Sequence, residues 1–260
     1  MAELNIDLHP AQLQIFHSKK RFKIVAAGRR FGKSYLSAWL LLINAIQSES
    51  KDVFYVAPTF QQGKDIMWSL LKELGQDLIA AAHENTATLT LINGRKIYIK
   101  GSDRPDTLRG NAASFLVLDE YSSMKPVVWE QILRPVLADV RGSCLMISTP
   151  AGKNHFYDTY NDALEDDDWD AFQFNSTDNP FLPEDEVEAA RKNMSSMAFR
   201  QEFEASFETG SGGIFNESWF KVDDEPEEGN FVIAVDPAGY EAIEQERNLK
   251  RSRLDETAIA

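Results

Sequence analysis

The stretch that decides the fold is Ala27-Gly28-Arg29-Arg30-Phe31-Gly32-Lys33-Ser34. It follows a short apolar segment, 22–26, and opens a segment with helical periodicity, 33–47. A glycine-containing turn from a strand into a helix, closed by Gly-Lys-Ser, is typical of a phosphate-binding loop. We therefore expect all eight residues to surround a nucleotide. Lys33 would reach the β- and γ-phosphates of ATP, and the Ser34 hydroxyl would bind Mg²⁺.

The loop departs from the usual pattern at its first position, where Ala27 stands in place of glycine. The neighbouring Gly28 can supply the backbone freedom that the turn needs. The alternative is a chance Gly-Lys-Ser on a surface turn, and the flanking strand and helix argue against it.

A second motif, Phe115-Leu116-Val117-Leu118-Asp119-Glu120, places two carboxylates after four apolar residues. Ligands of open parallel sheets bind at the carboxyl ends of the strands. We expect Asp119 to hold Mg²⁺ and Glu120 to polarise the attacking water as a general base. A strand that simply ends in an acidic turn is the alternative. The presence of both motifs, in this order, favours hydrolysis.

The segment Ser148-Thr149-Pro150 ends another apolar strand. Thr149 and its neighbour can sense the γ-phosphate, or the segment can be ordinary turn chemistry before a proline, and the local sequence leaves both open. Three arginines, Arg29, Arg104 and Arg109, are candidates to stabilise transition-state charge. The commoner fate of an arginine is a surface ion pair.

Alternating strand and helix patterns predict an α/β fold with a central, mostly parallel sheet flanked by helices. The predicted strands are 22–26, 53–57, 86–92, 96–100, 115–118, 143–147 and 171–175. The predicted helices are 33–47, 61–78, 126–138, 156–165 and 184–207, the last with a break near Ser195. Asn93-Gly94 predicts a hairpin turn between 86–92 and 96–100.

The composition limits the binding partners and the cell compartment that we expect for the chain. The 260 residues carry a net charge of −14, yet residues 1–110 hold 15 Lys and Arg against 10 Asp and Glu. This distribution disfavours non-specific nucleic-acid binding by the isolated chain and leaves the basic share beside the phosphate loop. A lone Cys144, no signal-peptide pattern and no apolar run longer than Ala38–Ile43 lead us to expect an intracellular protein without a membrane segment.

Taken together, these residues resemble the large terminase subunit of tailed double-stranded DNA bacteriophages. Leu8-His9-Pro10-Ala11-Gln12 resembles the adenine-recognition motif of that family, with Gln12 as the reader of the base. Thr107-Leu108-Arg109-Gly110, Ser148-Thr149-Pro150 and Thr177-Asp178-Asn179-Pro180-Phe181-Leu182 also resemble the family and occur in its order. The resemblance implies a P-loop NTPase of the ASCE type with a small helical lid subdomain.

The resemblance also implies a function: ATP hydrolysis that powers translocation of viral double-stranded DNA into a procapsid. The expected partners are DNA, the portal protein, a small terminase subunit and further copies of the chain in a ring, typically a pentamer, at the portal in the host cytoplasm. Arg29 would act in cis, and Arg109 would complete the active site of a neighbouring subunit.

The same family carries a nuclease domain of RNase H-like fold. Val232-Ile233-Ala234-Val235-Asp236-Pro237 resembles its first strand, and Asp236 would then be a metal ligand. We expect a P-loop ATPase domain with lid helices at 1–209, a linker at 210–230 and an incomplete start of the nuclease domain at 231–260. Cleavage needs several converging carboxylates, so we expect nuclease activity to be absent.

Two rival functions share part of this pattern. A superfamily 2 helicase or other translocase would share Gln12, the phosphate loop and Asp119-Glu120, but it needs a second RecA-like domain that residues 210–260 are too few to form. A non-hydrolysing nucleotide-binding or scaffold protein would not need intact Lys33 and Glu120.

Overall fold

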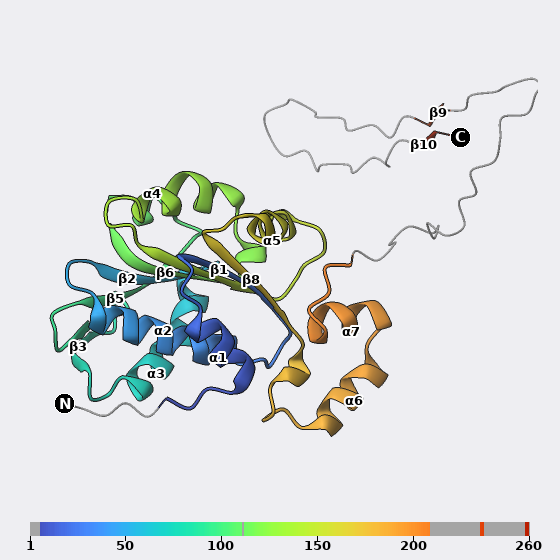
Figure 1. Cartoon of the computed structure of the whole chain (residues 1–260), viewed down its shortest axis with the longest axis horizontal. Coiled ribbons are helices and arrows are strands. Elements are labelled where there is room, and N and C mark those ends of the chain that lie inside the picture. Colours follow the sequence, from blue (N-terminus) through green and yellow to red (C-terminus); the bar gives the residue numbers. More distant parts are fainter. Residues whose placement is uncertain (1–5, 111, 209–234, 237–257, 260) are drawn as a thin grey trace, which may run out of the picture. The chain divides into compact units, whose positions relative to one another are not determined.

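An eight-stranded sheet in the order β3-β4-β5-β2-β6-β7-β1-β8 forms the centre of the fold (Figure 1). The computed structural model describes residues 6–110, 112–208, 235–236 and 258–259. The strands are β1 Phe22–Ala27, β2 Asp52–Ala57, β3 Ile79–His83, β4 Thr88–Leu91, β5 Lys96–Gly101, β6 Ala113–Asp119, β7 Ser143–Ser148 and β8 Trp169–Phe174. All neighbouring strands from β5 to β8 in this order pair parallel, while β4 pairs antiparallel with β3 and β5. The predicted mostly parallel α/β sheet is confirmed.

Helices cover both faces of this sheet, which explains why β1 is buried along its whole length. One face packs against α1 Pro10–His17, α2 Lys33–Gln47 and α3 Phe60–Leu74. The other face packs against a π-helix, Val128–Leu133, the short α4 Arg134–Val136 that continues it, and α5 His155–Glu165. Figure 1 shows the two layers on opposite sides of the strands.

Four elements differ from the sequence prediction. The helix predicted at 61–78 ends at Leu74, because Gly75 closes it with a hydrogen bond from its N–H to the Leu71 carbonyl oxygen. The strand β3 that follows was not predicted, since its four exposed residues lie at an edge of the sheet and lack an apolar pattern. Helix α1 was also missed, and the helix predicted at 126–138 is a π-helix followed by a single α-turn.

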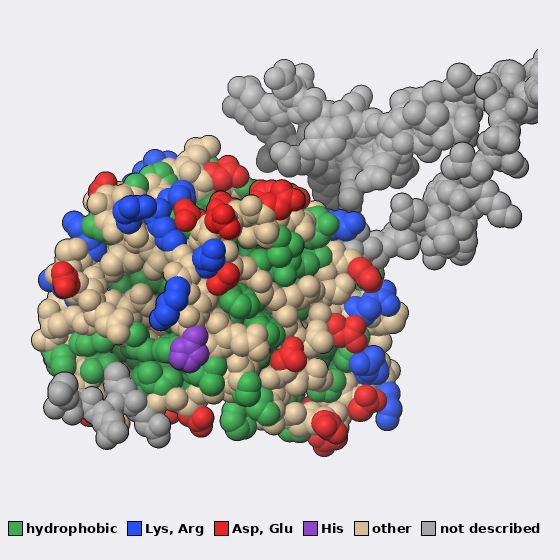
Figure 2. Space-filling model, viewed as in Figure 1, with side chains coloured by type: hydrophobic (Ala, Val, Ile, Leu, Met, Phe, Trp, Pro, Cys, Tyr) green, Lys and Arg blue, Asp and Glu red, His purple; other side chains and the backbone are tan. Residues whose placement is uncertain are grey.

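The predicted break near Ser195 is confirmed by two helices, α6 Glu184–Asn193 and α7 Ser196–Phe203. Ser195 caps α7 by accepting a hydrogen bond from the Ala198 N–H at 3.2 Å. Three acidic residues open α6 and two basic residues close it, which suits the helix dipole. Figure 2 shows both acidic and basic side chains over the part of the surface where Figure 1 places α6 and α7.

The chain divides into two units, Met1–Gly212 and Gly213–Ala260. In the second unit, β9 Val235–Asp236 pairs antiparallel with β10 Ala258–Ile259. Most of the segment 232–237 that resembles the first nuclease strand, the linker at 210–230 and most of the rest of the expected nuclease domain lie outside the described residues and stay predictions. Among the described residues, no helix is long and apolar enough to cross a membrane.

We predict that Leu71→Ala lowers the free energy of unfolding by about 2–5 kcal/mol, because Leu71 is fully buried between α3 and the sheet. Leu164→Ala is the matched control. Leu164 is 61% exposed on α5, so its change is expected to stay within about 0.5 kcal/mol. Urea unfolding of both variants measures the difference, and equal losses would contradict the packing described here.

Candidate active site

Three strand ends meet at one edge of the sheet and carry the predicted motifs. Strand β7 lies between β1 and β6, with Ala26 beside Ser148 and Asp119 beside Ile147. Because these strands are parallel, the loop after β1, the carboxylates after β6 and Thr149 after β7 emerge on the same side. This order of strands brings together residues that are more than 100 positions apart in the chain.

A cavity of about 600 Å³ lies at this edge. Five of the predicted site residues line it: Arg29, Arg30, Lys33, Glu120 and Thr149. Its remaining lining comes from α3, from the turn after β6, from the segment after Thr149 and from α7. The cavity therefore collects two positive side chains of the loop, the lysine of the motif and the second carboxylate of the Asp-Glu pair.

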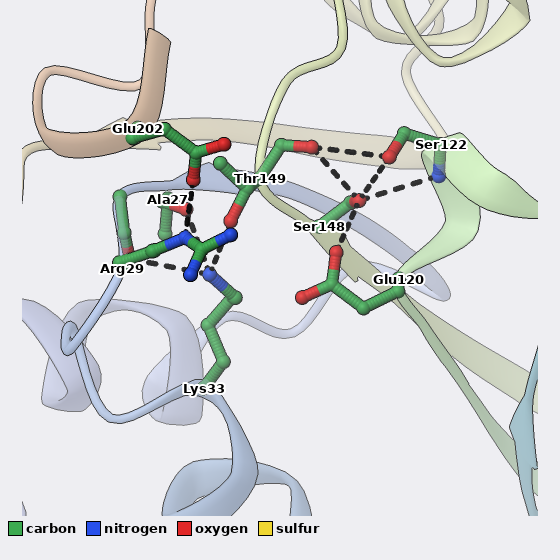
Figure 3. A network of polar contacts seen from close by, with 9 residues as sticks. Ala27, Arg29, Lys33, Glu120, Ser122, Ser148, Thr149 and Glu202 are labelled. Carbon is green, nitrogen blue, oxygen red and sulfur yellow. Dashed lines mark hydrogen bonds and ion pairs between the residues drawn. The ribbon is translucent and has the colours of Figure 1, made fainter. Parts of the chain in front are cut away.

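Lys33, the first residue of α2, is the most constrained side chain of the cavity. Its ammonium donates hydrogen bonds to the carbonyl oxygens of Ala27 (2.9 Å) and Gly28 (3.2 Å) and to the Thr149 hydroxyl (2.8 Å) (Figure 3). Burial lowers the pKa of Lys33, and the nearby carboxylates of Glu120 and Asp119 oppose that shift. The lysine thus connects the phosphate loop to the end of β7.

The backbone of the loop explains why glycine occurs at positions 28 and 32. Ala27 is the last residue of β1, so the turn itself begins at Gly28. A Cβ on Gly28 would lie 2.4 Å from Ser176 Oγ and 2.6 Å from the Phe203 carbonyl oxygen, so close approach, rather than flexibility, requires glycine here. Gly32 has φ 95°, a left-handed conformation that favours glycine. No side chain caps the start of α2 at Gly32, which leaves backbone N–H groups available to an anion.

Asp119 lies buried behind the cavity, where Tyr55 of the neighbouring strand β2 donates a hydrogen bond to its Oδ2. Its Oδ1 accepts from the Glu120 N–H at 3.1 Å. Burial raises the pKa of Asp119 to about 6, although these two hydrogen bonds and Lys33 oppose the shift. Burial and the adjacent Asp119 also raise the pKa of Tyr55 well above its ordinary value. Sequence reasoning missed Tyr55, since nothing in its strand pattern marks it.

Glu120 has φ 52°, an unusual left-handed conformation for a residue with a side chain. Its Oε2 accepts a hydrogen bond from Ser148 Oγ at 3.1 Å (Figure 3). Ser148 also accepts from the Ser122 N–H at 3.3 Å, which connects β7 to the turn after β6. Strained backbone of this kind concentrates at functional sites. The hydroxyl of Ser148, rather than that of Thr149, contacts the carboxylate.

Arg29 points across the cavity towards α7 and pairs with Glu202. Arg29 Nε lies 2.5 Å from Glu202 Oε2, and the Arg29 N–H donates to the Glu202 carbonyl oxygen at 2.7 Å. The side chain of Arg29 is still 68% exposed. On the other side of the loop, Asn179 Nδ2 donates to the Arg30 carbonyl oxygen at 2.6 Å. The helical segment after β8 therefore holds the phosphate loop at two points.

Gln12 and His9 contact the loop from α1. Gln12 Nε2 donates to the Gly32 carbonyl oxygen at 2.9 Å, and His9 Nε2 lies 2.9 Å from the Phe31 carbonyl oxygen. Gln12 Oε1 accepts from the His9 N–H, as part of the cap of α1. These two residues and Gly32 line a second cavity, of about 260 Å³. His9 belongs to the motif quoted from the sequence, but only Gln12 was assigned a role there.

The remaining predicted residues lie elsewhere or stay untested. Arg109 is 55% exposed, pairs with Asp106 at 3.6 Å and lines a groove with Gln131 and Ile132. Arg104 lines a different cavity, beside the start of α3. Asp236 belongs to the second unit of the chain. No group of three or more potential metal-ligating His, Cys, Asp or Glu side chains occurs in the part of the chain that the structure describes.

We predict that Asp119→Asn stabilises the protein at pH 7.5 in the absence of Mg²⁺ and nucleotide. The folded pKa of about 6 exceeds the ordinary 3.8, so ionised Asp119 destabilises the fold. That cost grows as the pH rises from about 4 to about 6, and it is fully present above pH 6, at about 3 kcal/mol. The advantage of the variant should therefore shrink at pH 4.5. Urea unfolding at both pH values measures it, with the exposed Asp139→Asn as control, and a pH-independent difference would contradict burial as the cause.

The comparisons with known proteins agree with this architecture. Residues 24–222 match the family described as "Terminase large subunit, T4likevirus-type, N-terminal". The chain is 30% identical over 208 residues to the large terminase subunit of Escherichia phage T5, which covers 76% of this chain and 46% of that protein. It is 24% identical over 243 residues to the large terminase subunit of Thermus phage G20c, with 80% and 50% covered.

The fold also matches a solved structure, the large terminase ATPase domain of Thermus phage P74-26. The TM-score is 0.69 at 23% identity, with 77% of this chain and 94% of that chain covered. The chain spans about half the length of the curated relatives that it matches. Because the family match at residues 24–222 covers well over half of the chain, the chain belongs to the terminase large subunit family.

Proposed function

We propose that this chain binds ATP with Mg²⁺ at the phosphate loop and hydrolyses the β–γ bond. The observation that carries the proposal is the convergence of Lys33, Thr149 and Glu120, from three different strand ends, on one cavity of about 600 Å³. The family membership favours a packaging ATPase over the superfamily 2 helicase considered from the sequence. A large terminase from a thermophilic bacteriophage has been solved with ADP and with ATP-γ-S, which supports nucleotide binding in this family.

The residues present fit a magnesium nucleotide. A buried ammonium, that of Lys33, faces the cavity with only neutral oxygen acceptors, and the uncapped start of α2 offers backbone N–H groups for phosphate oxygens. Asp119 and Ser34 would supply oxygen ligands of the kind that Mg²⁺ prefers. The raised pKa of Asp119 indicates that its charge is poorly compensated, which a nearby cation would correct. When bound, Mg²⁺ would neutralise charge on the phosphates.

Each side chain of the site would then have a separate role in hydrolysis. Lys33 would orient the terminal phosphate, and Glu120 would accept the proton of the attacking water. The bond from Ser148 holds the Glu120 carboxylate in a defined position before the reaction. Arg29 would stabilise the developing charge in cis after it exchanges Glu202 for phosphate oxygens. Thr149, now bonded to Lys33, is placed to respond to loss of the terminal phosphate.

We further propose that hydrolysis drives double-stranded DNA into a procapsid. The chain would act in a ring of copies, typically five, with the portal protein and a small terminase subunit, at the portal in the host cytoplasm. The position of Arg109 favours this ring of subunits, because its side chain is 55% exposed and lies outside the cavity that Lys33 and Glu120 line. An arginine in this position is available to the active site of a neighbouring copy.

Phosphate release by the purified chain tests the enzymatic activity. We expect Lys33→Ala to abolish ATP binding and release. Glu120→Gln should lower kcat by about 10²–10⁴-fold with ATP affinity retained, because the amide cannot accept the proton. Lys72→Ala is the control, since Lys72 pairs with Glu84 on the surface. Equal rates for the wild type, Lys33→Ala and Glu120→Gln would exclude hydrolysis at this site.

The trans role of Arg109 predicts a rate per chain that rises with protein concentration. Arg109→Ala should remove that rise and lower kcat by about tenfold or more, with ATP affinity unchanged. Arg104→Ala is the matched control, from the same connection between β5 and β6. A loss of nucleotide affinity with unchanged turnover, or a larger effect from Arg104→Ala, would exclude this role for Arg109.

A further inference from the structure

The cavity of about 260 Å³ beside Gln12 has an aromatic wall that the proposed mechanism does not use. Tyr35 of α2 lines it from one side, and Phe181 lines it from the connection between β8 and α6. Phe181 belongs to the stretch 177–182 that sequence analysis singled out without a chemical role. Its side chain is 71% exposed, the highest value among the large hydrophobic residues that the structure describes. A ring left uncovered at the mouth of a cavity can be covered by a flat ligand.

The position of Phe181 is set by the phosphate loop. Asn179 Nδ2 donates to the Arg30 carbonyl oxygen at 2.6 Å, and Asn179 Oδ1 accepts from the Phe181 N–H at 3.0 Å. The same amide therefore anchors the segment to the loop and shapes the turn that carries the ring. Pro180 between them restricts the backbone further. One short side chain thus connects the phosphate loop to the backbone of Phe181.

Adjacent residues of the phosphate loop line the two cavities, which indicates the part of a nucleotide that the cavity beside Gln12 would receive. Gly32 lines the cavity of Gln12 and Phe181, and the next residue, Lys33, lines the cavity with Glu120. With the phosphates at Lys33, the base of the nucleotide would reach the cavity beside Gln12. The lining there combines amide groups, from Gln12 and Asn179, with the rings of Tyr35 and Phe181. This mixture suits a nucleobase, which has polar edges and an apolar face.

We propose that Phe181 is a nucleotide-binding residue, whose ring stacks on the base of the nucleotide bound at the phosphate loop. The inference rests on the proposed nucleotide binding, and it assigns to Phe181 the part of the affinity that comes from the base. Stacking on an aromatic side chain tolerates any base, because every base has a π-face. Phe181 thus contributes affinity to ATP and GTP alike and contributes nothing to a ligand that has phosphates alone.

Binding of ATP and of inorganic tripolyphosphate, each with Mg²⁺, separates these contributions. For Phe181→Ala we expect the Kd for ATP to rise about tenfold and the Kd for tripolyphosphate to stay within about twofold of wild type. Phe181→Tyr should restore ATP binding, because the ring is retained. Leu164→Ala, which removes another exposed apolar side chain, on α5, should change neither value. The urea midpoint of each variant confirms that it folds.

The outcomes distinguish two failures. If Phe181→Ala weakens ATP and tripolyphosphate equally, Phe181 supports the loop and does not contact the base, which overturns the inference. If the wild type binds ATP and Phe181→Ala binds it as tightly, the inference also fails while the proposed function stands. If the wild type binds neither ligand, the proposed function fails, and the inference fails with it.

Discussion

The buried ammonium of Lys33 is the interaction on which the site depends. It hydrogen-bonds to two carbonyl oxygens of its own loop and to the Thr149 hydroxyl, so the turn after β1 and the end of β7 share one cation. This arrangement requires β7 to lie directly beside β1, which the parallel sheet provides. A buried cation is costly unless its hydrogen bonds are satisfied, and these oxygens satisfy them.

The helical segment after β8 is joined to the same loop. Glu202 of α7 holds Arg29, and Asn179 holds the Arg30 carbonyl oxygen, while Gly28 packs so closely that a Cβ would not fit. A change in the loop on nucleotide binding would therefore be transmitted to α6 and α7. The same connections place Phe181 beside Gln12, so the two ends of a nucleotide would be sensed by one rigid assembly.

The carboxylates differ in how they are supported. Asp119 is buried and held by Tyr55, whereas Glu120 faces the cavity and is held by Ser148 in a left-handed conformation. Adjacent residues at the end of one strand thus have different surroundings, which suits the separate roles proposed for them. Of these four residues, only Glu120 lines the cavity.

The sequence by itself determined the order of the motifs, the parallel sheet, the Asn93-Gly94 hairpin and the break at Ser195, because turns, caps and strand patterns depend on neighbouring residues. It did not reveal β3, whose exposed edge position leaves no apolar pattern. Only the tertiary structure decided the pairs Tyr55 with Asp119, Arg29 with Glu202, and Asn179 with Arg30. The residues of each pair are 64, 173 and 149 positions apart, and only the folding of the whole domain brings such distant residues into contact.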